Sequence, residues 1–279
     1  GLVIGGQGGA VDVTGGIELA GTLKATSYDS TATALLINED STVDRIAVSG
    51  TLSATLTSTG EGEVYAIRDL SGSLTSIENS GFITTSASSE DIQQAIAASS
   101  NTTGLTIIQY LNDEDAETKA DIEADLDDDE TDDTIYTAII GDIVTGSGND
   151  LISASAGVII GDTYFNAGND TLTLSDDAAY TGDVYFGTGT GLMTLSGESA
   201  FVGDIDGAGQ SVLVTLNDSA VYTGTVQNGS GVSVVVDGGT FRVGDAKTST
   251  FDSLTVGSGG TLGVYIDGEE GTSSLYEMN

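Results

Sequence analysis

Short apolar or alternating apolar-polar runs fill most of this chain, and turn residues interrupt them at regular intervals. In the C-terminal half a Gly-Asp step recurs with a nearly constant spacing, at Gly141, Gly161, Gly182 and Gly203. Gly224-Thr225 and Gly244-Asp245 extend this series at almost the same interval. A glycine turn and a run such as Leu172-Thr173-Leu174 follow each of the first four steps. Alternation with a period of two predicts short β-strands that bury one face.

The N-terminal half repeats with a longer period. Three equivalent glycines mark this repeat, and an isoleucine lies four residues before each of them: Gly21, Gly50 and Gly81. Further upstream, Leu35-Leu36-Ile37 aligns with Tyr65-Ala66-Ile67, so that Leu35 would stand opposite Tyr65. A weaker copy follows around Ile96 and Ile107.

These two periods, built from short strands and Gly/Asn/Asp turns, predict an all-β parallel β-helix with coils of about 20–30 residues. Each repeat would form one coil around a narrow apolar core, and neighbouring coils would pair through main-chain hydrogen bonds about 4.8 Å apart. The repeats divide the chain into a β-helix at 1–111, an acidic insertion at 112–135 and a β-helix with 20–21-residue coils at 136–279, all in one continuous solenoid. A β-sandwich is the alternative, but it does not require so constant a period.

The segment between the two repeat blocks is strongly acidic. Asp and Glu fill 13 of the 22 positions from 112 to 133. Because no core periodicity is visible, we predict a solvated loop extruded from the solenoid, with a short helix over residues 116–126. The alternative is a site for a divalent cation or a cationic partner, although the spacing of an EF-hand is absent.

Composition excludes several functions. The chain has 279 residues, a net charge of −37 and no Pro, Cys, His or Trp. Without His or Cys there is no Ser-His-Asp triad, thiol nucleophile, ordinary zinc site or disulfide. Because the charge repels phosphate groups, we predict no nucleic acid and no anionic membrane among the partners.

The Gly-Asp step also predicts where part of the charge lies. Four aspartates occupy the same position of successive coils and would stack in one acidic column: Asp142, Asp162, Asp183 and Asp204. Such a column costs stability unless water, salt or a cation screens it.

Four turn residues are candidate Ca²⁺ ligands: Asn149, Asp150, Asn169 and Asp170. They end two Gly-rich turns that resemble part of the Ca²⁺-binding nonapeptide repeat of RTX proteins. Here the two turns lie a whole coil apart, and the third equivalent turn, at 187–191, has lost both Asn and Asp. The alternative is an ordinary turn in which the two asparagines stack as an amide ladder. No other cofactor is predicted.

Carboxylate catalysis on a polysaccharide would need two acids at a suitable separation. The basic residues form no column that could assist, because Arg45 aligns with Ser76 and Arg68 with Asn38. We therefore predict no catalytic residues and no enzyme. An aromatic series could still hold sugar rings or form an internal ladder, with one member of each adjacent pair pointing outward: Tyr164-Phe165, Tyr180, Tyr185-Phe186, Phe201 and Tyr222.

The chain resembles the passenger domains of type V autotransporters of Gram-negative bacteria. The resemblance rests on residues 95–109 (AIAASSNTTGLTIIQ), 140–150 (IGDIVTGSGND) and the repeats SGTLSA, YAIRD and IENSGFI further upstream. It covers roughly residues 15–265. It implies a right-handed β-helix that is exported across the outer membrane by a C-terminal β-barrel not included in this sequence. The absence of cysteine and the coil-by-coil architecture suit a chain that crosses a narrow pore unfolded.

These observations predict a non-enzymatic, cell-surface or secreted β-helical passenger with a structural or adhesive role. Its partners would be other copies of itself, or surface glycans and proteins of a host or the environment. A Ca²⁺-dependent surface-layer or extracellular matrix protein is the second hypothesis, and a polysaccharide-degrading β-helix enzyme is the third.

Overall fold

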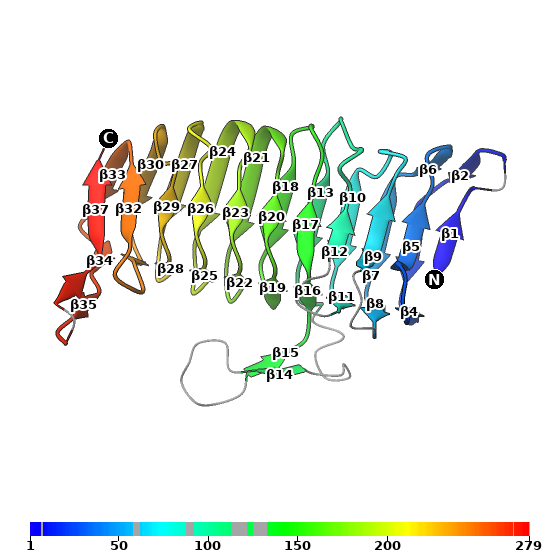
Figure 1. Cartoon of the computed structure of the whole chain (residues 1–279), viewed down its shortest axis with the longest axis horizontal. Coiled ribbons are helices and arrows are strands. Elements are labelled where there is room, and N and C mark those ends of the chain that lie inside the picture. The colour runs from blue at the N-terminus through cyan, green and yellow to red at the C-terminus, as the bar shows by residue number, and fades with distance from the viewer. Residues whose placement is uncertain are drawn as a thin grey trace.

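The protein is a rod of stacked β-strands (Figure 1). The computed structural model describes residues 1–6, 8–57, 62–87, 92–112, 122–124, 133–269 and 271–278. These residues form strands and turns and no helix, and therefore no helix that could span a membrane. All but eight of the strands belong to three long parallel sheets of 9, 10 and 10 strands.

The three sheets are named here in the order in which each coil visits them. The first sheet contains β1 (Leu2–Ile4), β5 (Ala32–Ile37), β9 (Glu63–Asp69), β12 (Ile92–Ala97), β17 (Asp142–Val144), β20 (Thr163–Tyr164), β23 (Val184–Tyr185), β26 (Ile205–Asp206) and β29 (Val226–Gln227). The second contains β3 (Ile17–Leu19), β7 (Arg45–Val48), β10 (Ser76–Asn79), β13 (Thr106–Gln109), β18 (Leu151–Ala154), β21 (Ala167–Leu174), β24 (Thr188–Leu195), β27 (Ser211–Leu216), β30 (Val232–Val236) and β33 (Ser253–Val256). The third contains β4 (Thr22–Ser27), β8 (Thr51–Leu56), β11 (Phe82–Ser86), β16 (Ala138–Ile140), β19 (Val158–Ile160), β22 (Ala179–Thr181), β25 (Ala200–Val202), β28 (Val221–Thr223), β31 (Thr240–Arg242) and β34 (Thr261–Gly263).

Four smaller pairs complete the fold. Two are parallel: β2 (Val11–Val13) with β6 (Ser41–Val43), and β32 (Thr248–Phe251) with β37 (Leu275–Met278). Two are antiparallel: β14 (Ile122–Ala124) with β15 (Asp133–Ile135), and β35 (Ile266–Asp267) with β36 (Thr272–Ser273).

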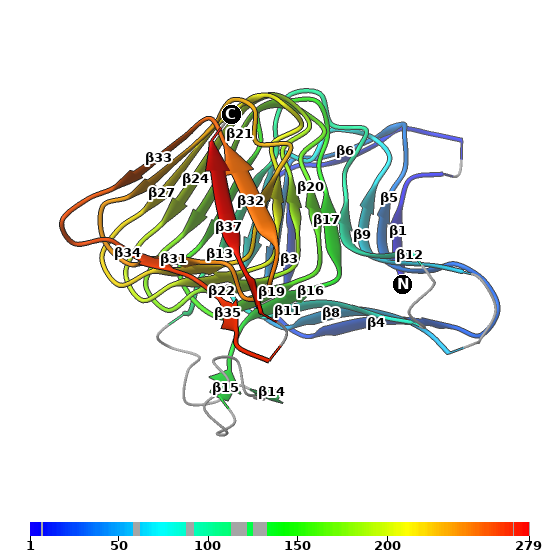
Figure 2. The same cartoon turned by 60° about the vertical axis from the view of Figure 1, so that its left-hand side comes forward.

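The coils wind in a right-handed sense. In Figure 1 the strands of the first sheet run upward in front and the chain returns behind them. Successive coils advance from the right, where the N-terminus lies, to the left, where the C-terminus lies. Figure 2 looks closer to the rod axis and shows the second and third sheets closing the coil. Right-handed crossover is the rule for parallel strands. The predicted right-handed parallel β-helix is confirmed.

Strand register confirms part of the predicted repeat alignment and corrects part of it. Ile46 of β7 pairs with Ile17 on one side and with Ile77 on the other, as the glycine spacing predicts. The predicted pairing of Leu35 with Tyr65 is wrong, because Leu35 of β5 pairs with Ile67 of β9. A shift of two positions keeps every side chain on its own face, so the apolar pattern does not detect it. For the same reason Arg68 pairs with Leu36 and not with Asn38.

A second correction concerns the end of the Gly-Asp series. Thr223 pairs with Arg242, and Gly224 N–H donates to Arg242 O, so this coil is one position shorter than the sequence repeat predicts. The Gly244-Asp245 pair therefore lies one position beyond the place that Gly224-Thr225 occupies, and it is not a further copy. One deleted residue resets the register without disturbing the core.

The core is a stack of equivalent apolar side chains. One column on the second sheet passes through nine consecutive coils: Ile17, Ile46, Ile77, Ile107, Ile152, Leu172, Met193, Val214 and Val234. On the third sheet, Tyr180, Phe201, Tyr222 and Phe241 form a row of tilted and edge-to-face rings with centroids 5.2, 5.0 and 4.8 Å apart. All four rings are buried. The internal aromatic ladder is therefore present, and it fills the space between coils that small side chains would leave empty.

Most of the acidic insertion lies outside the described residues. Within it, β14 pairs with β15 in a short antiparallel hairpin next to β16 (Figure 1). The predicted helix is therefore wrong at residues 122–124, where inter-strand hydrogen bonds override a weak local helix propensity.

Candidate functional site

The corner between the third and first sheets carries the predicted acidic column. The Oδ1 atom of each aspartate accepts the backbone N–H of the equivalent residue in the next coil. The donor-acceptor distances are 3.0, 2.8, 2.7 and 2.8 Å for Asp142, Asp162, Asp183 and Asp204 as acceptors. The last donor is Thr225, where the series of carboxylates ends. The four aspartates thus stack as predicted, and each one links two coils.

The glycine of each Gly-Asp step makes this column possible. Gly161, Gly182 and Gly203 have φ values of 135°, 143° and 155°. A Cβ atom on Gly182 would lie 2.1 Å from the carbonyl oxygen of Gly161, and one on Gly203 would lie 1.9 Å from that of Gly182. The glycine lets the chain turn in close contact with the previous coil. The aspartate then provides an acceptor for an N–H that the ladder leaves free.

The Oδ2 atoms of two aspartates in the column contact tyrosine, glutamine and lysine side chains. Tyr164 Oη lies 3.3 Å from Asp162 Oδ2, and Gln227 Nε2 donates to Asp204 Oδ2 over 2.8 Å. Lys247 Nζ is 3.9 Å from the same oxygen of Asp204. Burial and the neighbouring carboxylates raise the pKa of Tyr164, so its hydroxyl remains a proton donor. This corner presents a row of negative charge with phenol groups beside it.

The aromatic pair on this face confirms the predicted alternation. Phe165 is fully buried, whereas Tyr164 is partly exposed and stacks on Tyr185 with centroids 4.7 Å apart and planes at 1°. Phe165 stacks internally on Phe186 at 5.4 Å. Because the tyrosines lie face to face, each ring covers one face of the other and withholds it from a ligand.

The corner between the first and second sheets contains the four predicted Ca²⁺ ligands, which separate into two pairs. Asn149 and Asn169 are exposed, and Asn169 N–H donates to Asn149 Oδ1 over 2.8 Å. Asp150 and Asp170 point inward and are 2% and 1% exposed. Alternation along the chain causes this division. The structure brings asparagine to asparagine and aspartate to aspartate, but it does not gather all four around one point.

The two inward aspartates form an unusual pair. Asp170 Oδ1 accepts the N–H of Asp150 over 2.9 Å, and Asp150 Oδ1 accepts the N–H of Leu105 over 2.7 Å. Within the described part of the chain, the Oδ2 atoms of both residues are buried without a hydrogen-bond partner. Burial raises the pKa of both carboxyls, that of Asp170 to about 6. Buried polar atoms without a partner are rare and call for an explanation.

No larger metal-binding group accompanies this pair. Among residues that the structure describes, no three or more Asp or Glu side chains gather in a way that could hold a metal ion. Any cation at the corner would therefore depend on two carboxylates and on neutral oxygens.

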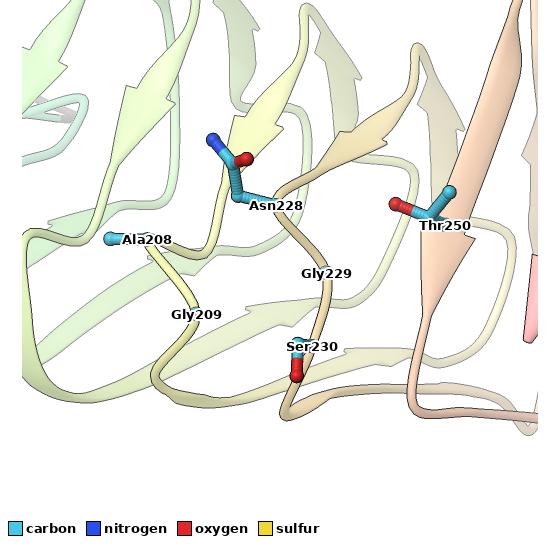
Figure 3. Close-up of a pocket in the computed structure, with 6 residues that line it drawn as sticks. All are labelled: Ala208, Gly209, Asn228, Gly229, Ser230 and Thr250. Carbon is cyan, nitrogen blue, oxygen red and sulfur yellow. The ribbon is translucent and has the colours of Figure 1, made fainter. Parts of the chain in front are cut away.

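The same corner opens into a notch near the C-terminal end (Figure 3). The notch has a volume of about 470 Å³ and is lined by Ala208, Gly209, Asn228, Gly229, Ser230 and Thr250. Ala208 and Asn228 have positive φ values of 49° and 47°. Asn228 Nδ2 donates to Asp206 Oδ2 over 2.9 Å, which fixes the amide at the rim. The lining of amide, hydroxyl and backbone groups suits an uncharged, hydroxylated ligand.

The notch was not among the sequence predictions. The notch lies between an Ala-Gly pair and an Asn-Gly pair one coil apart. Such pairs predict turns, but they do not predict a cavity between two successive turns. That space depends on how far two coils separate, which the local sequence does not encode.

The outer face of the second sheet carries Arg45, a basic residue bound to two glutamates. Arg45 forms two hydrogen bonds of 2.8 Å with Glu78 and lies 3.4 Å from Glu18. The hydrogen bond from Arg45 lowers the pKa of Glu78. A carboxylate held ionised in this way is a poor general acid for glycoside hydrolysis. Arg45 instead links three successive coils.

Comparisons with protein-family models, with curated proteins and with solved structures find no match for this chain.

Proposed function

We propose that this chain is a non-enzymatic β-helical passenger, exposed on the cell surface or secreted, with a structural or adhesive role. The observation that carries the proposal is that two sets of ionisable side chains, the acidic column and the Arg45 cluster, connect coils. The acidic column accepts an N–H from each next coil. Arg45 bridges two glutamates on the coils either side of its own. Groups used in this way hold a rod together.

The architecture supports export without disulfides. Each coil rests on its predecessor through three parallel sheets, so the rod can fold progressively once one end is in place. The net charge of −37 opposes aggregation of an unfolded chain. Both properties agree with the resemblance to autotransporter passengers.

The localisation part of this proposal is tested on intact cells of the source organism. Antibody labelling and added protease should reach the native protein without lysis of the cells, or the protein should be found in the medium. A protein that stays protected until the cells are broken would contradict the proposal.

The adhesive part predicts a contact for neutral glycans at the notch. Binding of the protein to immobilised glycans should weaken about tenfold in Thr250→Val and in Asn228→Gly, which keeps the positive φ. Thr194→Val, on the outer face of the second sheet, is the matched control and should bind normally. Equal binding by all three variants would mean that the glycans bind at a surface other than the notch. No binding to any glycan would leave only the structural role.

A further inference from the structure

We propose that Asp150 and Asp170 form a binding site for one Ca²⁺ ion inside the corner between the first and second sheets. The proposal is independent of the adhesive role. It rests on two adjacent buried carboxylates whose Oδ2 atoms have no partner among the described residues. Their other oxygens are occupied by backbone N–H groups, which fix both side chains in place.

The spacing of the two residues favours a metal ion over a shared proton. Leu151 pairs with Thr171, so the two preceding aspartates hold equivalent positions one coil apart. Equivalent atoms of neighbouring parallel strands are about 4.8 Å apart. A direct O–H···O bond requires about 2.5–3.0 Å, so one proton cannot join both oxygens at this spacing. Two oxygens on opposite sides of Ca²⁺, each at about 2.3–2.6 Å, are about 4.6–5.2 Å apart.

The surroundings of the pair limit the site to these two coils. On one side the equivalent residue is Leu105, and on the other it is Gly191. A Cβ atom on Gly191 would lie 2.5 Å from the ring of Phe186, so the ring takes the place of a third acid. The site is thus closed at both ends by apolar side chains, and two negative charges would face one dication.

Neutral oxygens adjoin the pair. Thr145 is fully buried, and its hydroxyl lies beside the carboxyl of Asp150. Carboxylate, hydroxyl and backbone carbonyl oxygens are the ligands that Ca²⁺ prefers. Mg²⁺ is less suited because it requires shorter bonds of about 2.0–2.1 Å and near-ideal octahedral geometry. Zn²⁺ is less suited because it favours nitrogen and sulfur ligands.

The test compares the chelator-treated protein with an Asp150→Asn/Asp170→Asn double variant. Because the chain has 43 Asp and Glu, loose Ca²⁺ binding elsewhere is expected, and only the difference between the two proteins counts. Calorimetric titration with CaCl₂ should give one additional site in the wild type. Its melting temperature should rise by about 5 °C or more at saturating Ca²⁺, and MgCl₂ should have a smaller effect.

Asp142→Asn, in the acidic column at the other corner, is the matched control and should retain the additional site. Tyrosine-sensitised Tb³⁺ luminescence gives a second readout that does not depend on stability, and the double variant should lose its saturable component. The proposal is overturned if the wild type and the double variant respond equally to Ca²⁺, or if Asp142→Asn loses the site while the double variant keeps it.

Discussion

At the scale of single residues, the aspartate of the Gly-Asp step acts as a hydrogen-bond acceptor between coils. Replacing Asp183 by Ala leaves the N–H of Asp204 without its 2.7 Å acceptor. We expect a loss of about 1–2 kcal/mol in the free energy of unfolding, measured by urea denaturation. Asp183→Asn keeps an acceptor oxygen and should cost less than about 0.5 kcal/mol. Equal losses in both variants would mean that charge, and not the hydrogen bond, is what Asp183 contributes.

A second prediction at this scale concerns pH. The pKa of Asp170 is raised to about 6, above the value of about 3.9 in an unfolded chain. The folded state therefore binds this proton more tightly, so the contribution of Asp170 to stability is fully present below about pH 4 and is lost as the pH rises through 6. Two pKa units correspond to about 3 kcal/mol as an upper limit.

The variant Asp170→Asn tests this linkage, because its amide is neutral at every pH. In the presence of a chelator it should melt several degrees above the wild type at pH 7.5 and at about the same temperature at pH 4. Saturating Ca²⁺ should reverse the order at pH 7.5. If the variant melts lower than the wild type at pH 7.5 without Ca²⁺, burial does not disfavour the ionised carboxylate of Asp170, and the prediction is wrong.

At the scale of the coil, the glycines of the Gly-Asp step allow the backbones of successive coils to lie in close contact. Gly182→Ala would place a methyl group 2.1 Å from the carbonyl oxygen of Gly161, at a φ of 143° that alanine rarely adopts. We expect a loss of about 3 kcal/mol or failure to fold. Gly21→Ala is the control, since no described atom lies within 4 Å of its Cβ position. Similar melting temperatures for the two variants would contradict this role of the glycine.

The sequence was sufficient to predict the coil wherever alternation was clear. The pairing of Ile17, Ile46 and Ile77 and the stacking of the acidic column both follow from spacing alone. It was insufficient in β5 and β9, because their consecutive buried residues tolerate a shift of two. A repeat pattern fixes which face a residue occupies better than it fixes which residue lies opposite.

The candidate sites were predictable to a smaller extent, and for a physical reason. The Gly-Asn-Asp motif predicted Asn149, Asp150, Asn169 and Asp170 as candidate ligands of one kind, without separating the asparagines from the aspartates. Alternation of adjacent side chains placed the asparagines outside and the aspartates inside. The unpaired oxygens and the notch beside Asn228 depend on packing between coils, which one repeat does not specify.

At the scale of the whole molecule, wide N-terminal and narrow C-terminal coils share one core. The apolar column that begins at Ile17 continues without a break to Val234, although the coils become shorter toward the C-terminal end. Part of the extra length of the wide coils lies in their strands: β5 and β9 of the first sheet have 6 and 7 residues, whereas β23 and β26 have 2 each. A solenoid of this kind can vary the length of its first-sheet strands while the column of the second sheet continues.

The charge of the whole rod makes its stability dependent on salt. Adjacent carboxylates of the acidic column repel by about 1 kcal/mol at about 4.8 Å in water, and the net charge of −37 adds to this. Since the Debye length falls from about 30 Å at 0.01 M salt to about 10 Å at 0.1 M, we expect the melting temperature to rise by several degrees over this range in NaCl. Asp162→Asn/Asp204→Asn keeps an acceptor oxygen at both positions but removes alternate charges. This variant should show a smaller increase. A melting temperature that falls with salt would instead mean that the ion pairs of Arg45 outweigh the repulsion.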